Sequence, residues 1–224
     1  MGAAIGEILG LAAGVAVSPL PIVAMILVLA TPRGRANGSL FGIGWLAGLS
    51  ILGTVVLLLA GPAEAADEGG PAAWTGWLKL LLGVLVLLLA VRQWRGRPAP
   101  GAAPEMPKWM AGLDRLKPGG ALGLGALLSG VNPKNAALTI AAAATIAGAG
   151  LPGGEQAVTL AVFVVIGSIG VLAPLIVYLV GGQHAARTLD TWKTWAADHN
   201  AAVMAVLFVV FGFKLVGDGI AVLF

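Results

Sequence analysis

In Ser18-Pro19-Leu20-Pro21, two prolines fall in the middle of an apolar run that covers residues 3–30. A second run, residues 119–147, is interrupted in the same way by Asn132-Pro133-Lys134-Asn135. Proline inside a helix removes a backbone donor and clashes with the preceding turn, so each run is predicted to form two half-helices. At membrane depth such breaks are tolerated only where the freed backbone is buried in protein or lines a cavity, and in transporters they surround the binding site.

The composition indicates that lipid surrounds most of the chain. Hydrophobic residues make up 58% of the 224 residues and charged residues 10%, whereas soluble domains carry about 25% charged residues. A membrane helix needs about 20 apolar residues, so the length has room for six or seven spans and leaves none for a separate catalytic domain. The absence of cysteine excludes disulfides and thiolate metal sites.

The hydropathy pattern predicts an all-α, multi-pass membrane protein with six transmembrane helices. The predicted spans are residues 3–30, 38–60, 74–91, 119–147, 155–180 and 200–222. The connectors after the first, third and fifth spans carry arginine and lysine, whereas the other two carry acidic residues without a basic one. The positive-inside rule therefore predicts that both termini lie outside.

The two breaks occupy matching positions in two halves of the sequence. Leu9-Gly10-Leu11 precedes the first break and Leu122-Gly123-Leu124 precedes the second, although so apolar a chain can repeat Leu-Gly-Leu by chance. Three spans separate the copies, which turns the second copy upside down and predicts two inverted three-helix repeats. The predicted organisation is a first repeat in residues 1–95, a proline-rich basic cytoplasmic linker with a short interfacial helix in residues 96–118, and the inverted repeat in residues 119–224.

Small residues recur at every fourth position before both breaks, beginning at Gly2 in the first span and at Ala121 in the fourth. Small faces let helix backbones approach closely in lipid, so the first and fourth spans are expected to pack through them. The glycine faces would equally suit a homodimer.

The half-helices that follow the prolines are predicted to bind an anionic group. Their leading amides lack intrahelical partners, and each helix N-terminus carries a partial positive charge. Lys134 adds a full charge whose burial at mid-membrane costs about 2.5–3.5 kcal/mol, which favours a functional role. The predicted substrate-binding residues are Ser18, Pro19, Pro21, Asn132, Pro133, Lys134 and Asn135. The alternative is that the serine and the two asparagines only satisfy backbone groups freed by proline.

Two further charge pairs are expected within the spans. Glu7 and Lys79 would neutralise each other across the first and third spans, and Lys214 and Asp218, four residues apart, would pair on the sixth. One possibility is that the carboxylate of Glu7 or of Asp218 carries a coupling proton. The other is that both pairs are only structural. No catalytic residue, cofactor or metal site is predicted, because the chain has no HExxH, GxSxG or GxxxxGK[ST] motif. Nucleic acid is not expected as a partner.

Five segments resemble the GAP family, the glycopeptidolipid- and sulfolipid-addressing proteins of the lysine-exporter (LysE) superfamily. They are Ser18-Pro19-Leu20-Pro21, Pro32-Arg33-Gly34-Arg35-Ala36-Asn37-Gly38, Val91-Arg92-Gln93-Trp94-Arg95-Gly96-Arg97-Pro98, Asn132-Pro133-Lys134-Asn135 and Lys214-Leu215-Val216-Gly217-Asp218-Gly219. The resemblance covers nearly the whole chain. It implies six helices in two repeats of three, a place in the bacterial cytoplasmic membrane, and export of small molecules or outward movement of envelope glycolipids.

Together these features predict an exporter, not an enzyme, that moves an anionic or zwitterionic amphiphile outward by alternating access. One alternative is an exporter of small solutes such as amino acids or ions. Another is a non-transporting accessory subunit of a larger lipid-export machine, since the chain has no nucleotide-binding motif of its own. The expected partners are membrane lipids, a glycolipid or small-molecule substrate, a second copy of the chain and lipid-export machinery.

Overall fold

The computed structural model describes residues 1–65, 73–96, 110, 112–113 and 116–224, and in this part of the chain all regular structure is helical. The α-helices are α1 (Gly2–Ala16), α2 (Pro19–Leu29), α3 (Gly34–Ala65), α4 (Ala73–Arg95), α5 (Pro118–Gly130), α6 (Pro133–Ala147), α7 (Gly153–Val180) and α8 (Ala185–Leu223). The short 3-10 helix Gly182–His184 joins α7 to α8. The predicted all-α class is confirmed.

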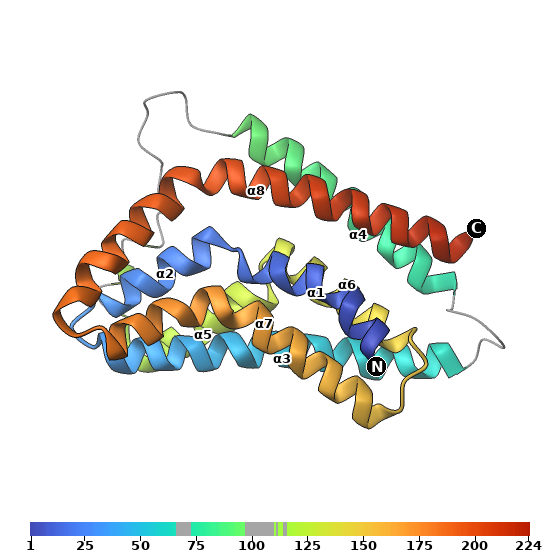
Figure 1. Ribbon diagram of the computed structural model, residues 1–224, viewed down its shortest axis with the longest axis horizontal. Coiled ribbons are helices and arrows are strands. Elements are labelled where there is room, and N and C mark those ends of the chain that lie inside the picture. Colours follow the sequence, from blue (N-terminus) through green and yellow to red (C-terminus); the bar gives the residue numbers. More distant parts are fainter. Residues whose placement is uncertain (66–72, 97–109, 111, 114–115) are drawn as a thin grey trace.

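Four helices, α3, α4, α7 and α8, are each long and apolar enough to cross a membrane. The pair α1 and α2, bent by 51° at its break, adds a fifth crossing if it forms one span. Residues 119–147 form α5 and α6, but this pair is not among the candidate crossings of the described chain, so the six predicted spans stay a prediction. The helices run mainly along the long axis of the molecule (Figure 1), as expected of a membrane protein.

The two ends of the molecule differ in charge. Both chain termini lie towards the same end of the long axis (Figure 1), and there the N-terminal amine approaches Glu155 Oε2 at 3.7 Å. At the opposite end lie the α2–α3 connector, the start of α5 and the α7–α8 connector with the start of α8, and α4 ends on this side of the molecule but nearer its middle. These segments contain most of the basic residues of the described chain, among them Arg33, Arg95 and Arg187. We call this the basic end.

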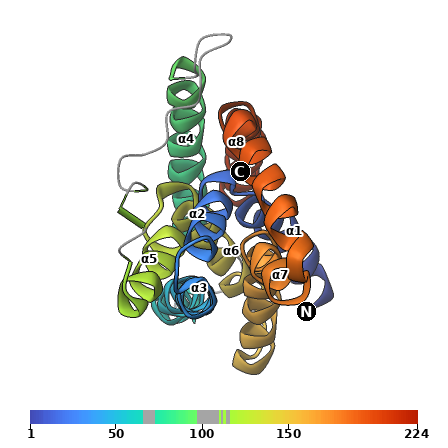
Figure 2. The ribbon, with the colours of Figure 1, turned by 90° about the vertical axis from the view of Figure 1, so that its left-hand side faces the viewer.

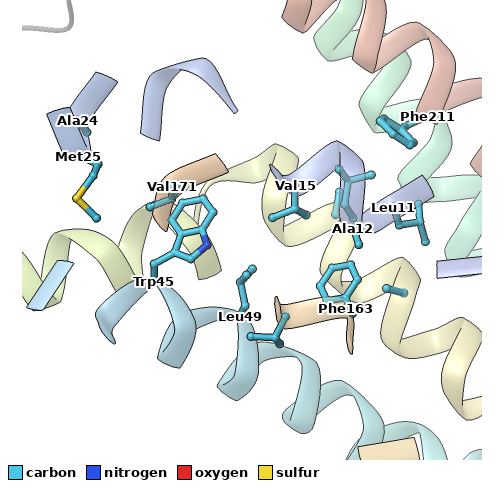
Figure 3. Packing of buried hydrophobic residues seen from close by; sticks show 14 of the residues in the cluster. Leu11, Ala12, Val15, Ala24, Met25, Trp45, Leu49, Phe163, Val171 and Phe211 are labelled. Atoms are coloured by element: carbon cyan, nitrogen blue, oxygen red, sulfur yellow. The ribbon is translucent and has the colours of Figure 1, made fainter. Parts of the chain in front are cut away.

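The core is formed by apolar side chains from all eight α-helices. Trp45 and Leu49 of α3 are fully buried, and the Trp45 indole lies beside Val171 of α7 (Figure 3). Phe163 of α7 points towards Ala12 of α1 in the same view. At the first break Ser18 is buried, whereas Val17 is 46% exposed, so the break is enclosed by protein on one side only.

The small-residue face of α5 packs against α3, not against α1, so the predicted packing of the two small faces is wrong. A side chain added at Gly125 would collide with the Phe41 carbonyl oxygen of α3, and one added at Gly44 of α3 would collide with the Leu122 carbonyl oxygen of α5. Both helices contribute glycines to this contact, which allows their backbones to approach more closely than either could approach a helix with larger side chains.

The small face of α1 meets larger side chains instead. A Cβ at Gly14 would lie 2.9 Å from Leu138 Cδ1 of α6 and against the ring of Phe211 of α8, whereas Gly2 and Gly6 have nothing within 4 Å. The two broken spans do contact each other, but through α1 and α6.

The last predicted span extends further than expected. Its helix, α8, begins at Ala185, so residues 185–199 and the predicted span 200–222 form one helix. Leu189 is buried in this first part, whereas Trp195 is exposed. The predicted interfacial helix of the linker falls largely outside the described residues, and the division into 1–95, 96–118 and 119–224 stays a prediction.

Candidate functional site: a buried lysine where two broken helices meet

Both apolar runs break at the prolines. The first is interrupted at Val17 and Ser18, between α1 and α2, and the second at Val131 and Asn132, between α5 and α6. In each case the helix resumes with proline as its first residue, a position where the missing N–H would have no partner anyway. The predicted breaks in both runs are confirmed.

Lys134, in the first turn of α6, joins the two breaks. Its Nζ donates to the carbonyl oxygens of Gly14 at 2.6 Å and Val17 at 3.2 Å, and to Ser18 Oγ at 2.5 Å. The side chain is 4% exposed. An ammonium has three N–H donors, so all of its hydrogen-bonding capacity is used. It also lies at the C-terminal end of α1, where the helix dipole favours a cation.

The first break explains why these acceptors are free. The Ser18 N–H bonds the Ala16 carbonyl instead of the Gly14 carbonyl, and Pro19 has no N–H to offer Val15. The Ser18 hydroxyl donates to the Val15 carbonyl at 2.6 Å, and Lys134 donates to the Gly14 carbonyl. Side chains therefore replace the lost backbone bonds of α1, as a buried helix end requires.

The second break is completed by its two asparagines. Asn132 Oδ1 accepts from the Lys134 backbone N–H at 3.1 Å, which makes it the N-cap of α6. Asn135 is fully buried, and its Nδ2 donates to the Leu128 carbonyl of α5 at 2.9 Å. Its Oδ1 lies 3.2 Å from Ser18 Oγ. Ser18, Asn132 and Asn135 thus perform the backbone-satisfying role that the sequence left open as the alternative.

The start of α2 offers little to an anion. Of the residues at its first turn, Pro19 and Pro21 have no N–H, so Leu20 supplies the one backbone donor between them. At the start of α6, the first amide after proline is already bonded to Asn132. The predicted attraction of an anion by paired helix N-termini is therefore weaker than the sequence suggested, and the positive charge of the site comes mainly from Lys134.

A cavity of about 180 Å³ lies beside the lysine at the level of both breaks. Its walls come from α2, α4, α6, α8 and the residues just before α2 and α6: Ser18, Leu20, Pro21, Gln93, Asn132, Lys134, Asn200 and Met204. Four predicted residues, Ser18, Pro21, Asn132 and Lys134, therefore line one space. The other three do not line it: Pro19 and Asn135 are buried, and Pro133 is exposed.

Sequence reasoning missed the contribution of α4 and α8. Gln93 follows Arg92 near the end of α4, where a polar residue is expected at a membrane surface. Asn200 is the first residue of a predicted span. Neither position carries a motif. The only available signal was that both amides occur next to long apolar segments, which is too common to single them out.

The cavity is suited to an anionic group that can pair with the positive charge of Lys134. Among the described residues that line it none is acidic, and no described carboxylate forms an ion pair with Lys134. The buried Asn200 Oδ1 has no hydrogen-bond partner. At about 30 Å³ per water molecule, the volume corresponds to about six waters, below the roughly 300–1,000 Å³ of pockets that enclose a whole ligand. It can hold a head group or a small solute.

The other two charge pairs differ from each other. Lys214 Nζ lies 2.6 Å from Asp218 Oδ2 on α8, with each side chain 34% exposed. Glu7 and Lys79 form no ion pair in the described structure: Glu7 is exposed, whereas Lys79 is 8% exposed. The reason is that α4 packs mainly against α8, while α1 packs against α6 and α7. The expected neutralisation of Glu7 by Lys79 is therefore not seen.

These features define a class: a multi-pass helical membrane protein whose interrupted helices meet around a buried lysine and a small polar cavity. Within that class, the chain belongs to the family of Sap, the sulfolipid-1-addressing protein, whose family model (SfLAP) matches residues 8–221. The match includes both breaks and confirms the resemblance to the GAP family. Comparison with curated proteins and with solved structures gave no match.

Proposed function

We propose that this protein is an export factor of the LysE-superfamily type that moves an anionic or zwitterionic amphiphile, such as an envelope glycolipid, outward across the bacterial cytoplasmic membrane. The single observation that carries the proposal is Lys134, a buried cation that no carboxylate of the described residues pairs with, beside a small polar cavity. Such a charge is costly at membrane depth, and a substrate anion would supply the missing partner. Membership of a sulfolipid-addressing family supports a lipid as the substrate.

In this proposal the chain crosses the membrane six times as two inverted repeats, with the broken pairs α1–α2 and α5–α6 as the first and fourth crossings. The basic end faces the cytoplasm, because basic residues are retained on that side, and both termini face outward. The cavity lies between α2, α4, α6 and α8, so elements of both repeats border the binding site. Rocking one repeat against the other would expose it to each side in turn.

The hydrogen bonds of Lys134 suggest how binding would drive that motion. Without substrate, the ammonium holds the C-terminal carbonyls of α1. An anionic head in the cavity would compete for the same N–H groups and release α1 from α6. A ligand shifts a conformational equilibrium only through different interactions with the two states, and this exchange of partners provides such a difference.

A flux measurement tests the proposal. The purified chain is reconstituted into liposomes with a fluorescent anionic glycolipid, and a membrane-impermeant quencher reports its movement between leaflets. Wild-type protein should accelerate this movement, Lys134→Met should abolish it, and Lys134→Arg should keep part of it because the charge is retained. Lys214→Met, at a part-exposed lysine outside the cavity, is the matched control. Wild-type flux in Lys134→Met would overturn the proposal.

The size of the cavity supports one other candidate. Its volume of about 180 Å³ suits a small anion or an amino acid, so the same liposomes are loaded with radiolabelled water-soluble solutes. Solute release without lipid movement would identify a small-solute exporter. Inactivity towards both, together with retention of the glycolipid inside cells that lack the protein, would favour an accessory subunit of a lipid-export machine.

A further inference from the structure

The helix pair α4–α8 is the most extensive contact between described helices, and it is not uniform along its length. At the end of this contact nearer the chain termini, glycines let the backbones of α4 and α8 lie against each other. A Cβ at Gly83 would lie 2.8 Å from the Val216 backbone nitrogen, and one at Gly219 would lie 2.9 Å from the Gly76 carbonyl oxygen. Backbones this close leave no space for another group between them.

Towards the basic end the same pair opens into a groove of about 480 Å³. Its walls include Ala90, Val91, Trp94 and Arg95 of α4 and Val206 and Val209 of α8. Val91 is 50% exposed and Val206 62% exposed, so the groove faces outward, to the hydrocarbon of a surrounding bilayer. Figure 2 views the molecule from this end, with α4 and α8 next to each other and α2 between them and the rest of the bundle.

The groove and the polar cavity lie on different faces of the same helix segments. Gln93 lines the cavity and its neighbour Trp94 lines the groove; on α8, Met204 lines the cavity and Ala205 the groove. Consecutive residues of a helix point about 100° apart. The seam between α4 and α8 at this level therefore separates a lipid-facing apolar space from the polar space that contains Lys134.

We infer that this seam is a lateral gate through which a lipid with an anionic head group enters the site, with an acyl chain in the α4–α8 groove and the head group passing between Gln93 and Met204 to Lys134. The inference rests on the proposed function and specifies its route. The cavity holds a head group but not a whole amphiphile. The tail must therefore remain outside, and the groove is the apolar space next to it.

The charges at the groove favour an anionic lipid over other occupants. Among the described residues that line it, Arg95 is the one with a charge, and Trp94 beside it is of the type that settles at the head-group level. A second copy of the chain would instead bring Arg95 against an identical surface with the same charge. Because the surrounding bilayer is as apolar as the groove, an acyl chain gains little free energy by moving from the bilayer into the groove. Retention must come from the head group at Arg95, Gln93 and Lys134.

Photolabelling in vesicles tests the gate. The full chain is placed in vesicles of phosphatidylglycerol and phosphatidylcholine that contain a trace of phosphatidylglycerol with a photoreactive acyl chain. Labelled residues are then located by mass spectrometry. Labelling of residues 87–95 and 205–210 should exceed labelling of Leu58 and Leu59, which are exposed on α3, by at least about tenfold, equivalent to about 1.4 kcal/mol of preference. A photoreactive phosphatidylcholine should show no such preference.

Two variants and one control sharpen the result. Val209→Trp fills the groove from a part-exposed position, and Ala205→Trp fills it from a buried one. Both should reduce labelling at the groove to the α3 level, whereas Leu58→Trp should leave it unchanged. Uniform labelling of wild-type protein, or cross-linking of two copies through α4 and α8, would overturn the gate.

The same experiment separates this inference from the proposed function. Flux of the glycolipid with uniform labelling would leave the transporter in place and remove the gate. Preferential labelling without flux would retain the lipid site and remove transport by the isolated chain.

Discussion

Lys134 Nζ lies 2.6 Å from the Gly14 carbonyl oxygen, so a side chain in the first turn of α6 completes the last turn of α1, 120 positions earlier in the chain. The contact joins the two broken spans directly. It also means that the cation of the candidate site has a structural role. Any variant of this lysine therefore has to be examined for structure as well as for transport.

Lys134→Met is expected to loosen the first break without a large change in overall stability. Each buried carbonyl left without a donor costs about 1–3 kcal/mol, and two are released, those of Gly14 and Val17. Against this, removing the charge recovers the burial cost of about 2.5–3.5 kcal/mol. The two effects nearly cancel. Hydrogen exchange measured by mass spectrometry should therefore rise at the end of α1 and start of α2, while the Tm in detergent changes little; unchanged exchange there would show that the contact is unimportant.

Gly125→Ala is expected to destabilise the protein, because an added methyl group collides with the Phe41 carbonyl oxygen of α3. Overpacking of this kind costs about 1–3 kcal/mol. Gly123→Ala is the matched control, since nothing lies within 4 Å of a Cβ at that position. Replacing glycine inside a helix there should stabilise the protein by about 0.5–1 kcal/mol. Thermal unfolding in detergent should give opposite shifts for the two variants; equal shifts would show that α3 and α5 do not pack through this contact.

Asp218→Asn is expected to leave the transport rate within about twofold of wild type. The pair with Lys214 spans four residues of α8 and lies outside the cavity, so neither side chain is expected to contact the substrate. Flux is measured in liposomes with and without a pH gradient. If Asp218 carried the coupling proton, the variant would lose its response to the gradient, and the structural interpretation of this pair would be wrong.

The positions of the breaks could be predicted from the sequence because proline acts locally: Pro19 and Pro133 remove backbone donors whatever surrounds them. The role of Lys134 could not be predicted, because its hydrogen-bond acceptors belong to a segment far away in the sequence. The spacing of small residues indicated close packing of α5, but periodicity describes one helix face and not its partner. Gln93 and Asn200 reach the cavity because the packing of the helices brings α4 and α8 beside α2 and α6, which no local sequence pattern indicates.

Asn132 provides the sharpest test of charge at the site, because two replacements preserve its structural role and differ in charge. Its Oδ1 caps α6 while the residue lines the cavity. Serine and aspartate cap helices about as well as asparagine, so Asn132→Ser and Asn132→Asp should both fold with a Tm close to that of wild type. Only Asn132→Asp places a carboxylate beside Lys134, where it would take the place of a substrate anion. Two like charges 4 Å apart near a protein surface repel by about 4 kcal/mol, so flux of an anionic lipid should fall by at least about tenfold in Asn132→Asp and persist in Asn132→Ser. Equal flux in the two variants would mean that the cavity does not receive an anionic group.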